Sequence, residues 1–434
     1  MTLITSNIPS IENESFNKIK QFQELQLKST LSYVSIHSPF YKKKFSENNI
    51  DALSIKTIED LQRIPVTTKD DLYRYNFDFL CVPKNKIIDY VTTSGTLGDP
   101  LTFALTDNDL ERLGYNESIS LACATGTHED IYQLMTTIDR RFMAGLAYFL
   151  GIKKLGAAIV RVGNGMPEFQ WDTIQRIQPT IAIAVPSFIL KLIEFAEANN
   201  IDYKNSSIKK IVCIGEPIRN EVFSYNTLGK RITEKWDVQL FSTYASTEMG
   251  AAFTECSEGK GGHHHPELVI AEFVDDQNNP VPDGELGELT ITTLGVEGMP
   301  LIRFKTGDMC KPYYDKCLCG RTTMRISPIL GRKQQMIKFK GTSLYPPSLY
   351  DVLNNISYVK NYIVEVYTNS IGTDEIDIHI GSNNAPENYE KELKDHFRAK
   401  LRVAPNIILT SPEIISKMQN TEMSRKPIVF IDKR

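Results

Sequence analysis

The stretch VTTSGTLGDP, residues Val91–Pro100, decides how the rest of the chain is interpreted. Its glycines let the backbone wrap closely around an anion, and its hydroxyls can donate hydrogen bonds to phosphate oxygens. It lacks the Gly-Lys-Ser/Thr ending of the phosphate loop of P-loop NTPases. The flanking segments IIDYV and LTFALT both have the pattern of strands, so we predict a loop that joins a hairpin. A simple hairpin turn rich in serine, threonine and glycine is the alternative.

Five further motifs follow this loop, and each of them is weak alone. They are IGEP (Ile214–Pro217), YASTE (Tyr244–Glu248), PLIRFKTGD (Pro300–Asp308), GRKQQMIKFKG (Gly331–Gly341) and SRKPIVFIDKR (Ser424–Arg434). Taken together and in this order, the six motifs resemble those of the adenylate-forming superfamily, which contains acyl-CoA synthetases, luciferases and peptide-synthetase adenylation domains.

Within that superfamily the chain is similar to the phenylacetate–coenzyme A ligase branch. The similarity extends over residues 38–434, and the length of 434 residues fits this shorter branch. The segments that carry it, besides the motifs above and the short C-terminal end, are Ser38–Asn76, Arg140–Ala157, Val185–Leu192 and Val281–Asp308.

The resemblance implies an α/β fold with two parts. A large N-terminal AMP-binding domain of layered α/β subdomains would span residues 1–331, and a small mobile C-terminal α+β domain would span 332–434. The residues agree with this expectation. From Ile87 to Asp308, short β-rich runs that end in Gly or Pro alternate with helical stretches, as buried strands of an α/β sheet do. The last hundred residues have the order strand, helix, strand, strand, helix, strand.

The resemblance also implies a two-step reaction. A carboxylic acid reacts with ATP to give an acyl-adenylate and pyrophosphate, and a thiol, usually that of coenzyme A, then displaces AMP. Both steps depend on positioning and on charge neutralisation around phosphate. ATP, Mg²⁺ and coenzyme A are therefore expected. An aromatic or arylacetic acid is the expected substrate.

By the same resemblance, individual residues receive roles toward the nucleotide. Thr247 would contact the α-phosphate, and Glu248 would help to hold Mg²⁺, a hard ion that prefers oxygen ligands. Lys426 would reach the carboxylate and α-phosphate oxygens during adenylation, a task that suits a flexible point charge. The other nucleotide-binding residues would be Thr93, Ser94, Gly95, Thr96 and Gly98 for the β- and γ-phosphates, Gly215, Glu216, Pro217, Tyr244, Ala245 and Ser246 around the base, and Asp308 with Arg332 for the ribose.

Each of these residues also has a plainer interpretation. Glu248 could cap a helix, Asp308 could be a turn residue, and Lys426 could be one solvated lysine among many. The sequence departs from the family pattern at Leu97, where a second threonine is usual, at Ala245, which replaces a glycine, at Gln334-Gln335, which replace an acidic pair near the hinge, and at Val429, where an arginine is more usual.

Cysteines and histidines gather near the nucleotide motifs, around residues 256–265 and 310–320. Three thiolates and one imidazole suit tetrahedral Zn²⁺. The spacing is not that of a standard zinc finger, but it resembles segments of some phenylacetate–CoA ligase-like proteins. From this resemblance we hypothesise a structural zinc on Cys256, His263, Cys317 and Cys319, which would pin two loops together. Free thiols and a solvated histidine run are the alternative. If the zinc is present, the other possible ligands are His264, His265 and Cys310.

The acyl pocket is also inferred from the resemblance, and plain core packing is its alternative. Its lining would be Ala144, Gly145, Tyr148, Pro186 and Ile214. Two other functions remain open. An adenylating enzyme could pass the acyl group to a carrier protein, a protein thiol or an amine, with identical adenylation motifs. A non-enzymatic nucleotide sensor could retain the fold.

The composition limits the kinds of partner and the cellular compartment that we expect for this protein. The chain has 49 basic and 53 acidic residues, a net charge of −4 and no basic block, which gives little support to a nucleic-acid partner. Seven cysteines are too few for a disulfide scaffold, so a reducing compartment fits better. The polar N-terminus and the absence of a run of 18 apolar residues predict a cytoplasmic protein without a membrane partner. A homodimer is possible.

Overall fold

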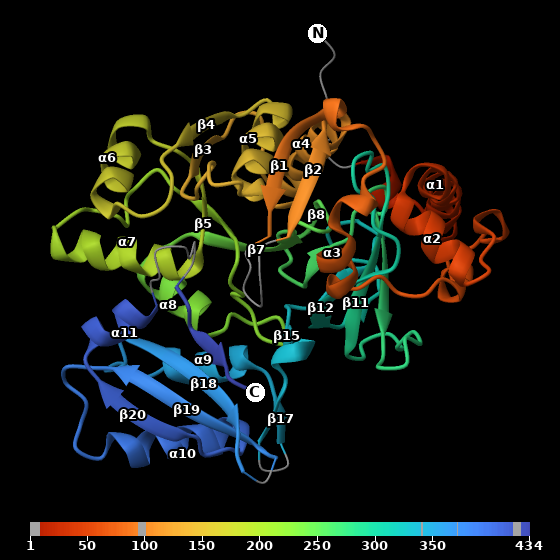
Figure 1. Ribbon diagram of the computed structural model, residues 1–434. Helices are drawn as coiled ribbons and strands as arrows, with labels where there is room; N and C mark the ends of the chain where they lie inside the picture. The colour runs from red at the N-terminus through yellow and green to blue at the C-terminus, as the bar shows by residue number, and fades with distance from the viewer. Residues whose placement is uncertain (1–8, 94–100, 340–341, 371, 420–426) are drawn as a thin grey trace. The chain divides into compact units, whose positions relative to one another are not determined.

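The computed structural model describes residues 9–93, 101–339, 342–370, 372–419 and 427–434. The chain divides into two compact units (Figure 1). Unit 1 consists of Met1–Tyr225 with Gly229–Pro328, and unit 2 consists of Asn226–Leu228 with Ile329–Arg434.

A nine-stranded mixed sheet organises unit 1. Strands β4, β3, β5, β6 and β7 are parallel neighbours in that order, and β8, β9, β14 and β13 continue the sheet as antiparallel neighbours. All four residues of β5 are buried, as expected of a parallel strand that is covered on both faces. The bounds are β3 Ile131–Leu134, β4 Ala158–Arg161, β5 Ile181–Ala184, β6 Lys210–Cys213, β7 Gln239–Ser246, β8 Ala251–Glu255, β9 Gly262–His263, β13 Pro312–Tyr313 and β14 Arg325–Ile326.

Two smaller sheets complete the strands of unit 1. The strands β1 (Ile87–Thr92) and β2 (Thr102–Thr106) pair antiparallel, with Val91 opposite Phe103. The prediction that strands flank the VTTSGTLGDP loop is therefore confirmed. The strands β10 (Val269–Val274), β11 (Gly287–Thr293) and β12 (Phe304–Cys310) form an antiparallel meander.

The helices of unit 1 begin at clear local signals. Helices α3 and α4 both start with a capping box, Thr68 with Asp71 and Thr106 with Asp109. Helices α4 and α5 pack side by side (Figure 1). They approach so closely at Gly151 that a Cβ there would come within 2.2 Å of the Glu117 Cβ. The helices are α1 Phe16–His37, α2 Pro39–Glu47, α3 Lys69–Tyr75, α4 Asp107–Cys123, α5 Met143–Leu155, α6 Pro167–Ile177, α7 Pro186–Ala198 and α8 Thr227–Lys235.

Unit 2 has its own sheet and its own core. The sheet has the order β20-β19-β18-β21, with an antiparallel central pair and parallel outer pairs. Buried aliphatic and aromatic side chains, Phe339 and Phe397 among them, form one cluster. The elements are β15 Gly331–Arg332, β16 Ile337–Phe339, β17 Thr342–Leu344, α9 Pro346–Asn354, β18 Asn361–Thr368, β19 Asp374–Gly381, α10 Tyr389–Leu401, β20 Asn406–Thr410, α11 Pro412–Gln419 and β21 Phe430–Asp432.

The α/β fold class predicted from the sequence is confirmed. The strand and helix order expected for the last hundred residues is present, and α11 adds a helix that the sequence pattern did not predict. Within the described residues, none of the helices combines the length and the apolar character that a membrane crossing needs.

Candidate active site and metal centre

The turn between β7 and β8 carries Thr247 and Glu248. The backbone N–H of Gly250 donates to the Ser246 carbonyl at 3.2 Å, and the Met249 N–H donates to the Ser246 hydroxyl at 3.2 Å, so the turn is tight. Gly250 has φ +54°, a conformation that costs glycine little. The alternative in which Glu248 caps a helix is wrong, because the residue joins two strands.

Glu248 has a cationic neighbour in the structure. Its carboxylate lies 3.5 Å from the Lys69 ammonium, and only 8% of the Glu248 side chain is exposed. Lys69 is the first residue of α3, whose start is fixed by the capping box. The sequence interpretation missed Lys69, because no short motif links residues 69 and 248.

Two predicted nucleotide-binding residues contact each other directly. The Tyr244 hydroxyl donates to the Asp308 carboxylate at 2.6 Å. Burial, and then the Asp308 charge, raise the pKa of Tyr244 far above its ordinary value, so the phenol remains a donor. Asp308 lies in β12 with 9% of its surface exposed, so the interpretation of Asp308 as a turn residue is wrong.

The predicted adenine loop lies at the same sheet edge as the β7–β8 turn. It follows β6, which is parallel to and paired with β7, and the carboxyl ends of neighbouring parallel strands meet at one edge. The Glu216 carboxylate accepts hydrogen bonds from the N–H and the hydroxyl of Ser187, both at 2.9 Å, so the loop is held against the start of α7. Gly215 has φ +75° and allows the sharp bend.

The remaining predicted nucleotide-binding residues lie in different parts of the chain. Thr93 accepts a hydrogen bond from the Leu101 N–H at 3.0 Å, at the loop end of the β1–β2 hairpin. Arg332 belongs to β15 in unit 2. Five predicted residues lie outside the described residues, namely Ser94, Gly95, Thr96, Gly98 and Lys426.

Three residues of the predicted acyl pocket share one apolar cluster. Tyr148 and Ile214 are buried in it, and Ala144 packs against it. Pro186 is the first residue of α7 and is also buried. Their role toward a substrate stays a prediction.

Gly145 is in close contact with another segment. A Cβ at this position would lie 1.9 Å from the Thr137 carbonyl oxygen. We expect Gly145→Ala to lower the free energy of unfolding by about 1–3 kcal/mol, the usual cost of overpacking. Chemical denaturation of wild type and variant measures this loss. Gly114→Ala is the matched control, because Gly114 is also a helical glycine and its Cβ would come no closer than 3.2 Å to another segment. An unchanged free energy of unfolding in Gly145→Ala would contradict the close contact.

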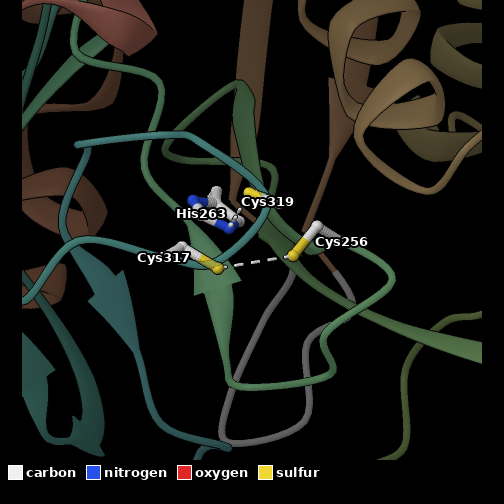
Figure 2. Close-up of side chains that lie close together, drawn as sticks. All are labelled: Cys256, His263, Cys317 and Cys319. Atoms are coloured by element: carbon white, nitrogen blue, oxygen red, sulfur yellow. Dashed lines mark hydrogen bonds between the residues drawn. The ribbon is translucent and has the colours of Figure 1, made fainter.

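The four side chains predicted to bind zinc come together in unit 1 (Figure 2). The ligand atoms of Cys256, His263, Cys317 and Cys319 all lie within 4.8 Å of one another. The Cys256 and Cys317 sulfurs are 3.7 Å apart, and the Cys319 sulfur is 3.6 Å from His263 Nε2. Usual zinc bond lengths in a tetrahedral site give separations of roughly 3.8 Å and 3.6 Å for such pairs. These two pairs therefore match a tetrahedral zinc site, and the four residues could hold the ion.

Local backbone structure explains how the ligands reach one point. Cys256 directly follows β8 and His263 ends β9, two paired strands. Cys317 and Cys319 lie in one turn, which closes when the Gly320 N–H donates to the Cys317 carbonyl at 3.0 Å. Gly320 has φ +98°, so the turn requires a glycine there.

Two of the four ligands have pKa shifts that suit a metal site, whereas the contact with Cys319 raises the pKa of Cys256 and burial raises that of Cys317. The Cys256 thiol, and after it His263, hold the pKa of the Cys319 thiol far below its ordinary value. Burial lowers the pKa of His263, which keeps its imidazole neutral, as a zinc ligand must be. His263 Nδ1 lies 3.3 Å from the Thr323 hydroxyl, a contact of the kind that orients metal-bound histidines.

A buried ion-pair network supports the cluster. Arg321 donates to the Cys319 sulfur at 3.6 Å and to the Glu12 carboxylate at 2.6 Å. His265 Nδ1 lies 2.5 Å from the other Glu12 oxygen. Although burial alone would raise it, His265 and Arg321 hold the pKa of the fully buried Glu12 below its ordinary value. The sequence interpretation missed Glu12, which lies 309 residues from Arg321.

The alternative metal ligands have other partners. His264 Nε2 lies 2.6 Å from the Val269 carbonyl oxygen, His265 contacts Glu12, and Cys310 is buried in β12. The interpretation of residues 263–265 as a solvated histidine run is wrong, because His263, His264 and His265 are 0%, 5% and 1% exposed. Among the described residues, the group arranged so that it could hold a metal is Cys256, His263, Cys317 and Cys319.

The chain matches a known protein family over much of its length. Residues 42–298 match the model of a family described as AMP-binding enzyme. This range is more than half of the chain, and the chain belongs to the family of AMP-binding enzymes. The sequence-based assignment to this class is confirmed.

Individual relatives give a finer comparison. The chain is 32% identical over 350 residues to the phenylacetate–coenzyme A ligase of Thermus thermophilus, covering 80% of this chain and 77% of the relative. It is 29% identical over 378 residues to the enzyme of the same name from Escherichia coli K12, covering 84% and 83%. The predicted resemblance to an AMP-forming acid–thiol ligase of the phenylacetate–CoA ligase type is confirmed.

A solved structure shows the same fold. The crystal structure of 2-hydroxyisobutyryl-CoA ligase in the postadenylation state, with bound 2-HIB-AMP, has a TM-score of 0.86 and 23% identity. The match covers 100% of this chain and 94% of that chain.

Proposed function

We propose that the protein is an ATP-dependent, AMP-forming ligase that converts an aromatic or arylacetic acid into its coenzyme A thioester. A carboxylate oxygen of the acid attacks the α-phosphorus of ATP, forms the acyl-adenylate and releases pyrophosphate. The thiolate of coenzyme A then attacks the acyl carbon, forms the thioester and releases AMP. The observation that carries this proposal is the Tyr244–Asp308 contact at the sheet edge that also presents Thr247 and Glu248.

Each residue at this edge has a task suited to its chemistry. Asp308 accepts hydrogen bonds from the ribose hydroxyls, and Tyr244 both holds Asp308 and packs beside the base. The Thr247 hydroxyl donates to the α-phosphate. Glu248 holds Mg²⁺, which neutralises phosphate charge when bound. Lys426 approaches from the small domain, for which we propose the range 332–434.

The Cys256, His263, Cys317 and Cys319 cluster has a separate, structural task in this proposal. A site with four protein ligands leaves no open position for a substrate, so the zinc takes no part in catalysis. It ties the β8–β9 pair to the loop at 317–319.

A pyrophosphate-release screen tests the proposed reaction. We expect release with aromatic or arylacetic acids to exceed release with short aliphatic acids, and AMP to accumulate only when coenzyme A is also present. The loss of one methylene from the acid is expected to change its kcat/KM by about 10–200-fold. Carrier protein and amine acceptors form parallel arms. Pyrophosphate release with AMP formation in those arms alone would contradict coenzyme A as acceptor, and no release with any acid would contradict the proposed reaction.

A further inference from the structure

Arg112, in the second turn of α4, joins three separate segments through their backbone carbonyls. Its Nε–H donates to Leu294 at 2.7 Å, its Nη1–H to Gly250 at 2.6 Å and its Nη2–H to Leu268 at 2.6 Å. Desolvation lowers the pKa of Arg112 to about 10, so the guanidinium remains charged at neutral pH. Its planar, forked donors suit this geometry, since a lysine ammonium could not reach all three carbonyls at once.

One of the three carbonyls belongs to the turn that carries Thr247 and Glu248. Gly250 closes that turn, and a Cβ at Gly250 would lie 3.3 Å from Arg112 Nη1. The other two carbonyls lie at the ends of β10 and β11, where the Leu294 N–H donates to the Leu268 carbonyl at 2.8 Å. The guanidinium therefore fastens the turn to a sheet.

Helix α4 is itself fixed at the same place. One turn before Arg112, the Asp109 carboxylate accepts hydrogen bonds from the N–H groups of Glu297 at 2.7 Å and Gly298 at 2.9 Å. Asp109 and Arg112 line a small cavity together with Thr247 and Glu248. The side chains of Asp109 and Arg112 thus lie next to the turn that carries Thr247 and Glu248.

We propose that Arg112 is a positioning residue for the turn Thr247–Gly250. It fixes the Thr247 hydroxyl and the Glu248 carboxylate where the α-phosphate and Mg²⁺ of the bound nucleotide require them. This inference rests on the proposed adenylation reaction for the roles of these two residues, but the clamp itself is a property of the folded chain.

Arg112→Lys tests the clamp, because it keeps the charge and loses the fork. We expect the Mg²⁺ concentration for half-maximal pyrophosphate release to rise about tenfold, as for other residues that orient metal ligands. The kcat of adenylation falls about tenfold or more, while the KM for the acid is unchanged. Without nucleotide or metal, hydrogen exchange at the Met249 and Gly250 amides accelerates.

Arg303→Lys is the matched control, because it also keeps the charge and loses the fork. Arg303 is buried and donates to the Ile64 carbonyl at 2.8 Å and to the Glu272 carboxylate, but has no contact with the turn among those found in the described residues. We expect a lower melting temperature with no change in the Mg²⁺ midpoint or in exchange at Met249 and Gly250.

The outcomes separate the two proposals. Unchanged exchange and an unchanged Mg²⁺ midpoint in folded Arg112→Lys overturn the clamp, even if the enzyme is active. Equal changes in Arg303→Lys overturn it as well. A wild-type protein that releases no pyrophosphate with any acid refutes the proposed reaction, whereas the exchange measurement still decides whether Arg112 holds the turn.

Discussion

Cys317→Ser is expected to abolish binding of the one equivalent of zinc that we propose for the wild type. The hydroxyl that replaces the thiol is a poor zinc ligand, and the loss of one of four ligands would weaken zinc binding by at least about 100-fold. We expect the melting temperature to fall as well, because the proposed metal would link Cys256 and Cys317, which are 61 residues apart in the sequence. Metal analysis after desalting, together with thermal unfolding with and without a chelator, measures both effects.

Cys310→Ser is the matched control for this experiment. Cys310 is also a buried cysteine, but it lies in β12 outside the cluster. Burying a hydroxyl there costs about 1–3 kcal/mol of stability, and the zinc content stays at one equivalent. Full zinc retention in Cys317→Ser, or no zinc in the wild type, would refute the proposed site.

Asp308→Ala is expected to have the largest effect on nucleotide binding. The substitution removes the proposed charged acceptor for the ribose hydroxyls, and hydrogen bonds to charged groups contribute about 1.5–3 kcal/mol each. We therefore expect the KM for ATP to rise about 100-fold while the KM for coenzyme A changes little. Steady-state kinetics gives both constants, and direct titration with ATP separates binding from turnover.

Tyr244→Phe is the milder partner of that variant. It removes only the hydroxyl that donates to Asp308 at 2.6 Å, and it keeps the ring. A rise of up to about tenfold in the KM for ATP is expected, since one hydrogen bond is lost and the carboxylate remains. If Asp308→Ala binds ATP as tightly as the wild type, Asp308 is not the ribose acceptor.

Short motifs with strong local chemistry could be interpreted from the sequence. The loop at Val91–Pro100 could be interpreted because its flanking strands, β1 and β2, are adjacent in the chain and are separated by a run of turn-forming residues. The proposed zinc ligands could be singled out because cysteine and histidine are few in this chain and gather around residues 256–265 and 310–320. In both cases the decisive residues lie in short stretches of the sequence.

Contacts between distant segments could not be predicted in this way. Arg112 reaches Gly250, Leu268 and Leu294 across 138 to 182 residues, and all three partners are backbone carbonyls, which every residue possesses. Gly145 could equally line a pocket or admit a neighbouring carbonyl, because only the position of Thr137 in space distinguishes the two. Such contacts leave no periodicity or motif in a single sequence.

The buried Glu12–Arg321 pair has a consequence for biosynthesis. Glu12 leaves the ribosome 309 residues before its partner does. At elongation rates of roughly 5–20 residues per second, the Glu12 carboxylate waits about 15–60 s for Arg321. The 3-10 helix Ser10–Asn13 therefore gains its Arg321 partner only after Cys256, Cys317 and Cys319 have been synthesised. The N-terminal segment thus completes its ion-pair network only when nearly all of the larger unit has been made.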